Sequence, residues 1–207
     1  MAGFPSPFDG GDDGALFDGD DEFVPEHLPE PGPFLEEHDV LTGAAHVAFH
    51  ERTRTVFEER TVYDMTFGYN LARLNLDTRH PDAGYRYAEE ADDQSVLRAA
   101  FTPTTPFCPQ THTLTIGSFR AWNGLAEHHE YDLVRVRADP MHHGSDEINT
   151  RLETLEAEYL ETGELPEPPA KGGGGSPSRR AIDGADAATG AANTDRRPSG
   201  RDSDVPF

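Results

Sequence analysis

Lysine, cysteine and long apolar runs are scarce in this chain. Lys171 is the only lysine among 17 basic residues, whereas 39 residues are acidic, and the formal net charge is −22. A single cysteine excludes an intramolecular disulfide, and no apolar run approaches the ~18 residues that cross a bilayer. Nucleic-acid backbones attract basic stripes, which this sequence lacks. We therefore expect a soluble, cytoplasmic protein with no nucleic-acid or membrane partner.

The same composition indicates the solvent in which the protein works. An acidic, lysine-poor surface keeps a protein hydrated in concentrated salt, so we infer an extreme halophile, of the haloarchaeal type, as the host. The charge then says little about partners. Nucleotide binding has no support either, because neither GxxxxGK[ST] nor GxGxxG occurs in the chain.

Composition divides the chain into three segments. Residues 1–40 are rich in acids, glycine and proline without any lysine or arginine, and residues 164–207 are rich in proline, glycine and serine. Such segments bury too little apolar surface to offset their chain entropy. We predict that both tails are disordered, or dock only locally, around one domain at residues 41–163.

Hydrophobic periodicity in this central segment predicts a small α/β (α+β) domain. The expected order is helix, strand, strand, helix, strand, helix, at residues 41–59, 68–77, 95–102, 109–125, 131–139 and from an N-cap at Ser145 onward. Residues 80–93 contain Pro81, Gly84 and several acids, and are expected to form a long loop or ragged hairpin. A strand, helix and strand in succession require a crossover connection. We therefore predict a three-stranded mixed sheet with helices packed on one face.

Cys108 is the first candidate for a functional residue. It lies in the run TTPFCPQ at residues 104–110, between a predicted strand and a predicted helix. Pro109 suits the first helical position, which would place Cys108 at the positive end of the helix, where the thiolate is favoured over the thiol. That setting makes sulfur a nucleophile or metal ligand. A small buried apolar side chain is an equally good interpretation of the position.

Histidines are the second group of candidates. His112 follows Cys108 by four residues and would share its helix face, although a solvent-facing imidazole is the more common outcome. His142 and His143 follow a strand end and would approach Cys108 if both loops open at one sheet edge. His46 and His50 have the spacing of a zinc pair, but the sequence HVAFH lacks the glutamate of HExxH. Mononuclear zinc binding is therefore a minor hypothesis.

Two stretches of the sequence resemble the iron-sulfur cluster assembly domain of SufT-like and PaaD-like proteins. AFTPTTPFCP at residues 100–109 is similar to the family's strand and its Thr-Ser/Thr-Pro-Gly-Cys-Pro turn. VRVRADPMHHGSDEINTRL at residues 134–152 is similar to its closing strand, Pro-Trp segment and final helix. The resemblance extends over about residues 54–155. It identifies the chain as a divergent relative of this family.

The chain departs from the family at several positions. Phe107 stands where the family has a glycine before the cysteine, and Met141 stands where it has a tryptophan. Placing Gly68 on the family's strand glycine puts Glu59 on the glutamate of its Asp-Pro-Glu motif. The two residues before Glu59 are Phe and Glu instead of Asp and Pro. These departures affect the match at Glu59 most, because the Asp and Pro that precede the family's glutamate are both replaced.

The resemblance implies a non-catalytic assembly, transfer or adaptor protein that handles an iron-sulfur cluster through Cys108. It implies a supporting turn made of Thr105, Pro106 and Pro109. It also implies a possible second site made of Glu59, His112, His142 and His143. Clusters normally take four cysteine thiolates or a partial histidine substitute. One thiolate would therefore bind a cluster only transiently, with other ligands from the assembly machinery, a client apoprotein, a second copy in a homodimer or a small thiol.

Two function classes remain open at this point. No enzymatic activity is predicted, because a cysteine hydrolase built from Cys108, His112 or His142, and Asp139 has no specific spacing to support it. The first class is the iron-sulfur assembly or adaptor protein, without a stably bound cofactor. The alternative is a protein-interaction module of the same fold in which Cys108 is merely packed.

Overall fold

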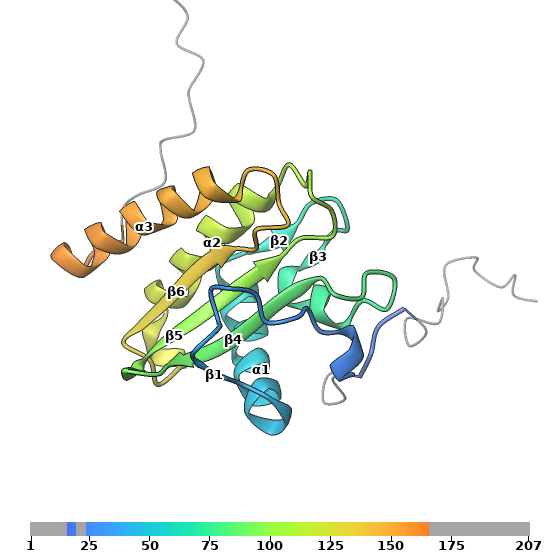
Figure 1. The fold of residues 1–207 in the computed structure, drawn as a ribbon, viewed down its shortest axis with the longest axis horizontal. Helices are drawn as coiled ribbons and strands as arrows, with labels where there is room; N and C mark the ends of the chain where they lie inside the picture. Colours follow the sequence, from blue (N-terminus) through green and yellow to red (C-terminus); the bar gives the residue numbers. More distant parts are fainter. Residues whose placement is uncertain (1–15, 20–23, 166–207) are drawn as a thin grey trace, which may run out of the picture. The chain divides into compact units, whose positions relative to one another are not determined.

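The computed structural model describes residues 16–19 and 24–165, whose fold is shown in Figure 1. Three helices accompany one four-stranded sheet: α1 (Gly43–Glu59), α2 (Thr111–Gly124) and α3 (Ser145–Thr162), with β1 (Asp39–Val40), β4 (Gly84–Glu90), β5 (Asp93–Thr102) and β6 (Leu133–Ala138). The strand order is β1-β4-β5-β6; β6 runs parallel to β5, and the other pairs are antiparallel. The predicted α/β domain with a mixed sheet is confirmed, with β1 as an additional edge strand.

The first predicted strand is wrong. Of residues 68–77, only β3 (Tyr69–Asn70) is extended, and it pairs with β2 (Tyr63–Asp64) in a separate hairpin. The next residues form the 3-10 helix η3 (Leu71–Leu76), because the Asn70 side chain accepts a hydrogen bond from the backbone N–H of Ala72. Short polar side chains that bond to a nearby backbone N–H favour caps and turns over strands.

The strand that pairs with β5 comes instead from residues 80–93, where we expect a long loop or a ragged hairpin, and the hairpin is what forms. β4 alternates Tyr85 and Tyr87, both fully buried, with Arg86 and Ala88. Proline, glycine and acids on either side conceal this short alternation in the sequence. At the start of α3, Ser145 is the first helical residue and not the N-cap, which is Gly144.

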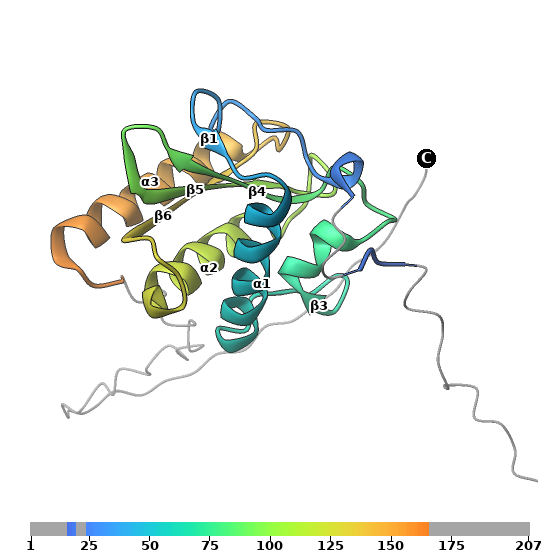
Figure 2. The ribbon, with the colours of Figure 1, turned by 90° about the horizontal axis from the view of Figure 1, so that it is seen from below.

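Helices cover one face of the sheet, and an N-terminal segment covers the other. Figure 2 shows α1 and α2 below the sheet, while the stretch that leads into β1 crosses above it. Leu35 of that stretch is fully buried against Ala88 and Ala100 of the central strands. Of the two outcomes expected for residues 1–40, disorder or local docking, residues 24–40 show docking on the sheet. The remaining parts of both predicted tails, residues 1–15, 20–23 and 166–207, lie outside the described residues.

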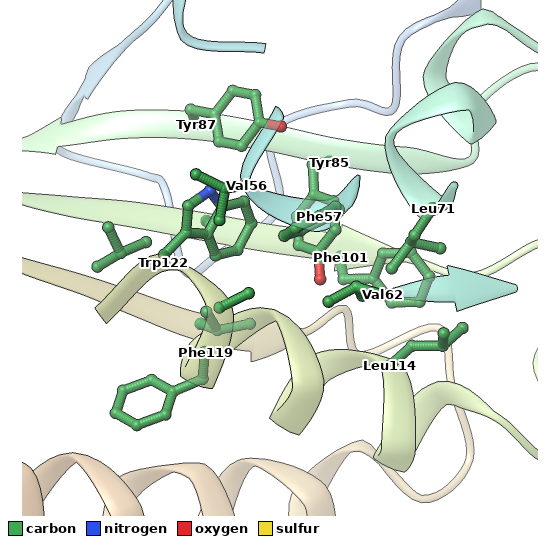
Figure 3. Packing of buried hydrophobic residues seen from close by; sticks show 14 of the residues in the cluster. Val56, Phe57, Val62, Leu71, Tyr85, Tyr87, Phe101, Leu114, Phe119 and Trp122 are labelled. Carbon is green, nitrogen blue, oxygen red and sulfur yellow. The ribbon is translucent and has the colours of Figure 1, made fainter. Parts of the chain in front are cut away.

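The core between the sheet and the helices is rich in aromatic side chains (Figure 3). The Trp122 ring of α2 lies 4.8 Å from Phe57 of α1 and 5.0 Å from Tyr85 of β4, measured between ring centroids. The phenol of Tyr85 donates to the hydroxyl of Ser118, with 2.7 Å between the oxygens. Aromatic pairs at these separations contribute beyond the area that they bury. Among the described helices, none is long and apolar enough to cross a bilayer.

The outer face of the sheet carries a chain of ion pairs beside α3. Glu90 pairs with Arg98 (2.5 Å) and with Arg135 (3.4 Å), and Arg135 also pairs with Glu156 of α3. The second carboxylate oxygen of Glu156 accepts a hydrogen bond from Arg137 at 3.1 Å. Glu156 is only 5% exposed, so this carboxylate is a structural element and not part of the solvated acidic surface.

Candidate functional site

Cys108 lies in the loop between β5 and α2, at the edge where the parallel strands β5 and β6 both end. Ligands of open α/β sheets bind at the carboxyl ends of such strands. The loop at residues 139–144, which follows β6, meets the Cys108 loop there. The imidazole Nε2 of His142 lies 3.1 Å from the carbonyl oxygen of Cys108. The structure therefore brings together Cys108 and the histidines that follow β6.

The predicted turn residues hold the Cys108 loop in place through their backbone. The N–H of Cys108 donates to the carbonyl of Thr105 at 3.3 Å, and the N–H of His143 donates to the carbonyl of Pro106 at 3.0 Å. Pro109 is exposed and contributes no N–H. The cysteine side chain is partly exposed at the end of this tight turn.

Cys108 does not stand at the start of the helix. The N-cap of α2 is Gln110 and its first residue is Thr111, so Pro109 precedes the helix instead of opening it. The influence of a helix dipole is concentrated on its terminal turn. The predicted placement of the thiol at the positive end of α2 is therefore wrong by two residues.

The His142 ring connects the cysteine loop to the loop that follows β6. Its Nδ1 accepts a hydrogen bond from the backbone N–H of Gly144 at 3.1 Å. The proton must then be on Nε2, which donates to the Cys108 carbonyl. Because both ring nitrogens are used, His142 positions the cysteine loop and offers no lone pair to a metal or to the thiol. Gly144 also forms the N-cap of α3.

Exposed apolar side chains lie on the cysteine loop and on the two loops that contact it. Phe107, Met65 and Met141 are 70%, 81% and 38% exposed, and we call these three residues the apolar rim. The Phe107 ring packs edge-on against His143, with 4.3 Å between ring centroids. The Met65 N–H donates to the side-chain oxygen of Gln110 at 3.0 Å, which ties the β2–β3 hairpin to the start of α2. Clusters of exposed apolar side chains mark interaction surfaces.

Sequence reasoning missed this rim as a unit. Phe107 and Met141 stood out only as departures from the family resemblance, and Met65 carried no signal because it lies in a separate hairpin. A search for large apolar residues inside predicted loops would have found all three. The contacts between the loops that carry them depend on tertiary packing.

Two other predicted site residues lie elsewhere. Glu59 ends α1 and pairs with His128 at 3.5 Å, in the short helix η4 (Ala126–His128) that follows the far end of α2. The 14 residues of α2 span about 21 Å, so Glu59 is remote from the cysteine loop. His112 is exposed and lines a surface depression with Asp146 and Glu147 of α3. His112 thus contributes to the depression beside α3, and Glu59 lies away from the cysteine loop.

Metal binding has little support among residues 16–19 and 24–165. No group of three or more His, Cys, Asp or Glu side chains there is arranged to hold a metal ion. The proposed zinc pair is engaged otherwise, because His50 Nε2 contacts the carbonyl of Ala72 at 2.8 Å and Nδ1 contacts the Tyr87 hydroxyl at 3.0 Å. Any cluster or ion at Cys108 would need ligands from another molecule.

His46 is instead a buried histidine of the core. It is 1% exposed, and its ring stacks on His50 and lies 5.2 Å from the ring of Tyr87. Burial, followed by the charges of His50 and Arg86, lowers the pKa of His46 to about 3. His46 is therefore uncharged in the folded protein at neutral pH, whereas in the unfolded chain it titrates near its ordinary value.

This difference predicts a loss of stability in mild acid. Below about pH 6.5 the unfolded chain takes up a proton that folded His46 excludes, so the free energy of unfolding falls by about 1.4 kcal/mol per pH unit until the folded pKa is reached. Urea titrations from pH 7 to pH 5 at fixed high salt should show a loss of about 2 kcal/mol from this group. His46→Phe should reduce the slope, and exposed His112→Gln should not. Equal slopes in wild type and His46→Phe would contradict the assignment.

Comparison with known proteins gives a family but no characterised relative. A family model described as a domain of unknown function, DUF7998, matches residues 15–166. No curated protein and no solved structure matches the chain. The matched range coincides closely with the described fold, from the first described residue to the end of α3.

Proposed function

Because the chain belongs to the DUF7998 family of domains of unknown function, we propose a function from its own residues: a non-catalytic adaptor that handles iron-sulfur clusters through Cys108. The resemblance of residues 100–109 and 134–152 to SufT-like and PaaD-like domains supports this proposal. These two stretches form the two loops that meet at the cysteine. The two stretches that carry the resemblance are therefore also neighbours in space.

The single observation that carries the proposal is the setting of Cys108. Its side chain is partly exposed on a loop held by the His142 ring, at the ends of β5 and β6, and the apolar rim lies on this loop and on the loops that contact it. A thiol placed in this way can reach a ligand that a docked protein presents. A cysteine that served only as core filling would be covered.

The number of ligands that an iron-sulfur cluster needs indicates what kind of partner Cys108 requires. One thiolate cannot complete the coordination of a cluster, and the described residues supply no further group of metal ligands. We propose that the partner is an assembly protein or client apoprotein that contributes its own cysteines, and that the cluster is a cargo in transit. The apolar rim would supply the contact area for that partner.

The test is cluster loading in the full chain at high salt. Anaerobic incubation with iron, sulfide and a small thiol should produce a visible cluster chromophore and protect Cys108 from alkylation. Cys108→Ser should abolish the chromophore. A matched variant, Cys108→Ser combined with Thr55→Cys, moves the thiol to an exposed position on α1 and should not restore it. The proposal fails if wild type forms no chromophore, or if the relocated thiol performs as well as Cys108.

A protein-interaction module is the second candidate, and the apolar rim is the observation that favours it. In this function Cys108 only fills the turn between Phe107 and Pro109. Its thiol would then be alkylated only after denaturation, and Cys108→Ala would leave partner binding unchanged. Rapid alkylation of the folded protein would instead favour the cluster adaptor.

A further inference from the structure

A cleft of about 610 Å³ is lined by residues between Pro25 and Glu51 and by Arg86, all of which lie outside the two cysteine loops. It is bounded by the segment that contains η2 (Pro25–His27), by the first turns of α1 and by β4. The volume is within the range of small-molecule sites in proteins, about 300–1,000 Å³. We call it the Arg86 cleft, after the one basic side chain besides histidine that lines it.

Arg86 is the unusual feature of this cleft. Its side chain is half-buried, its Nε is shielded from solvent, and within the described residues its guanidinium makes no hydrogen bond or ion pair. Burial lowers the pKa of Arg86, and the charge of nearby Glu30 acts in the opposite direction without forming a contact pair. A buried cation without a partner is costly.

The other arginines on this sheet show how unusual that is. Arg98, Arg135 and Arg137 each have a carboxylate partner, either Glu90 or Glu156. Among the described residues, Arg86 shares a shielded Nε and the lack of a carboxylate partner with Arg120 of α2, but Arg86 is the one of the two that lines a cleft of this size. This combination indicates that the anion for Arg86 comes from another molecule.

The start of α1 adds to the positive potential in the cleft. Its N-cap Thr42 makes no side-chain capping bond, and the first turn contains no acid. Thr42, Gly43 and Ala44 all line the cleft, so the partial positive charge of the helix end acts on the same space as the guanidinium. Both features favour an anion there.

The remaining walls define the rest of the ligand. Leu28, Val47 and Ala48 provide an apolar surface, and Glu51 lines the cleft one turn further along α1. Apolar walls favour a hydrocarbon body, and the Glu51 carboxylate disfavours a second negative charge. The ligand that fits is therefore a monoanion with an apolar body.

We propose that the Arg86 cleft binds a small organic monocarboxylate whose carboxylate pairs with Arg86 and whose apolar part lies along Leu28, Val47 and Ala48. Guanidinium and carboxylate match in geometry and form charge-assisted hydrogen bonds. This site is independent of Cys108 and of the proposed cluster function. Loss of one would leave the other intact.

The test is calorimetric titration of the full chain with octanoate, at the salt concentration that keeps it folded. Octanoate should bind, and octanol, which keeps the chain but lacks the charge, should bind at least about tenfold more weakly. Arg86→Gln should weaken octanoate binding by a similar factor. Arg52→Gln is the control, because Arg52 is on α1, the helix that lines the cleft, but it pairs with Glu130 and does not line the cleft itself.

A second variant tests the cleft without changing Arg86, so that the test does not depend on the folding of Arg86→Gln. Ala48 is exposed on the cleft wall, so Ala48→Phe should block octanoate while leaving the thermal midpoint of the unliganded protein unchanged. The proposal is overturned if the wild-type chain does not bind octanoate, if octanol binds equally well, or if Arg86→Gln and Ala48→Phe both bind like wild type.

Discussion

Gly84→Ala should reduce the free energy of unfolding by about 4 kcal/mol or more, from backbone strain and the loss of buried hydrogen bonds. Gly84 has φ of +115°, a conformation that side chains rarely adopt. A Cβ there would lie 2.4 Å from Oδ1 and 2.6 Å from Cγ of Asn75. Asn75 is 2% exposed and bonds both the N–H and the carbonyl of Tyr85 at 2.8 Å. Alanine would displace that amide and break both bonds at the first residues of β4.

This loss is a large fraction of the free energy of unfolding of a typical domain, which is about 5–15 kcal/mol in total. Urea unfolding at fixed high salt measures it, and Gly163→Ala is the matched control. Gly163 also has positive φ (+68°), but nothing lies within 4 Å of its Cβ position. It should therefore cost only the backbone strain, about 1 kcal/mol. Equal losses in the two variants would show that Asn75 makes no difference.

Glu156→Ala should cost about 3–5 kcal/mol, because it removes one partner of a buried ion pair and leaves the other charged. Arg137 is 9% exposed and bonds Glu156 at 3.1 Å, and Arg135 pairs with the other carboxylate oxygen. Phe34 lies over Arg137, with 5.3 Å from guanidinium carbon to ring centroid. After the substitution, water could not reach Arg137 without disturbing this cover.

Glu153→Ala provides the control on the same helix. Its carboxylate also contacts Arg137, at 3.6 Å, but it is 63% exposed. Exposed ion pairs contribute about 0–1 kcal/mol, so this variant should unfold close to wild type. Chemical denaturation of both proteins at two salt concentrations makes the comparison. If Glu153→Ala cost as much as Glu156→Ala, burial would not be the deciding factor.

These two sites also show where sequence patterns lose their predictive value. In the sequence, Gly84 together with Pro81 and nearby acids indicates a long loop or ragged hairpin. In the structure, the missing side chain of Gly84 allows Asn75 to lie close to β4. Glu156 belongs to an acid-rich sequence in which carboxylates are typically solvated, yet it closes an ion-pair chain beneath α3. In both cases the environment comes from residues distant in the chain.

The candidate site was only partly predictable from the sequence. The position of Cys108 between a strand and a helix, and of His142 after another strand, followed from local patterns. That the two loops meet followed from the parallel pairing of β5 and β6. The exact helix start was not predictable, because Pro109 is compatible both with the first helical position and with the preceding turn.

The sequence by itself determined the element types with long, regular periodicity, namely α1, α2, α3, β5 and β6, and hence the α/β class. It also determined that the chain has one thiol and a large excess of acids. Only the tertiary structure decided which segment pairs with β5, which acids are buried, and that Arg86 lines a cleft with no partner among the residues that the structure describes. The reason is physical: local periodicity reflects backbone geometry and one-sided burial, whereas strand pairing, buried charge and clefts depend on contacts between residues far apart in the chain.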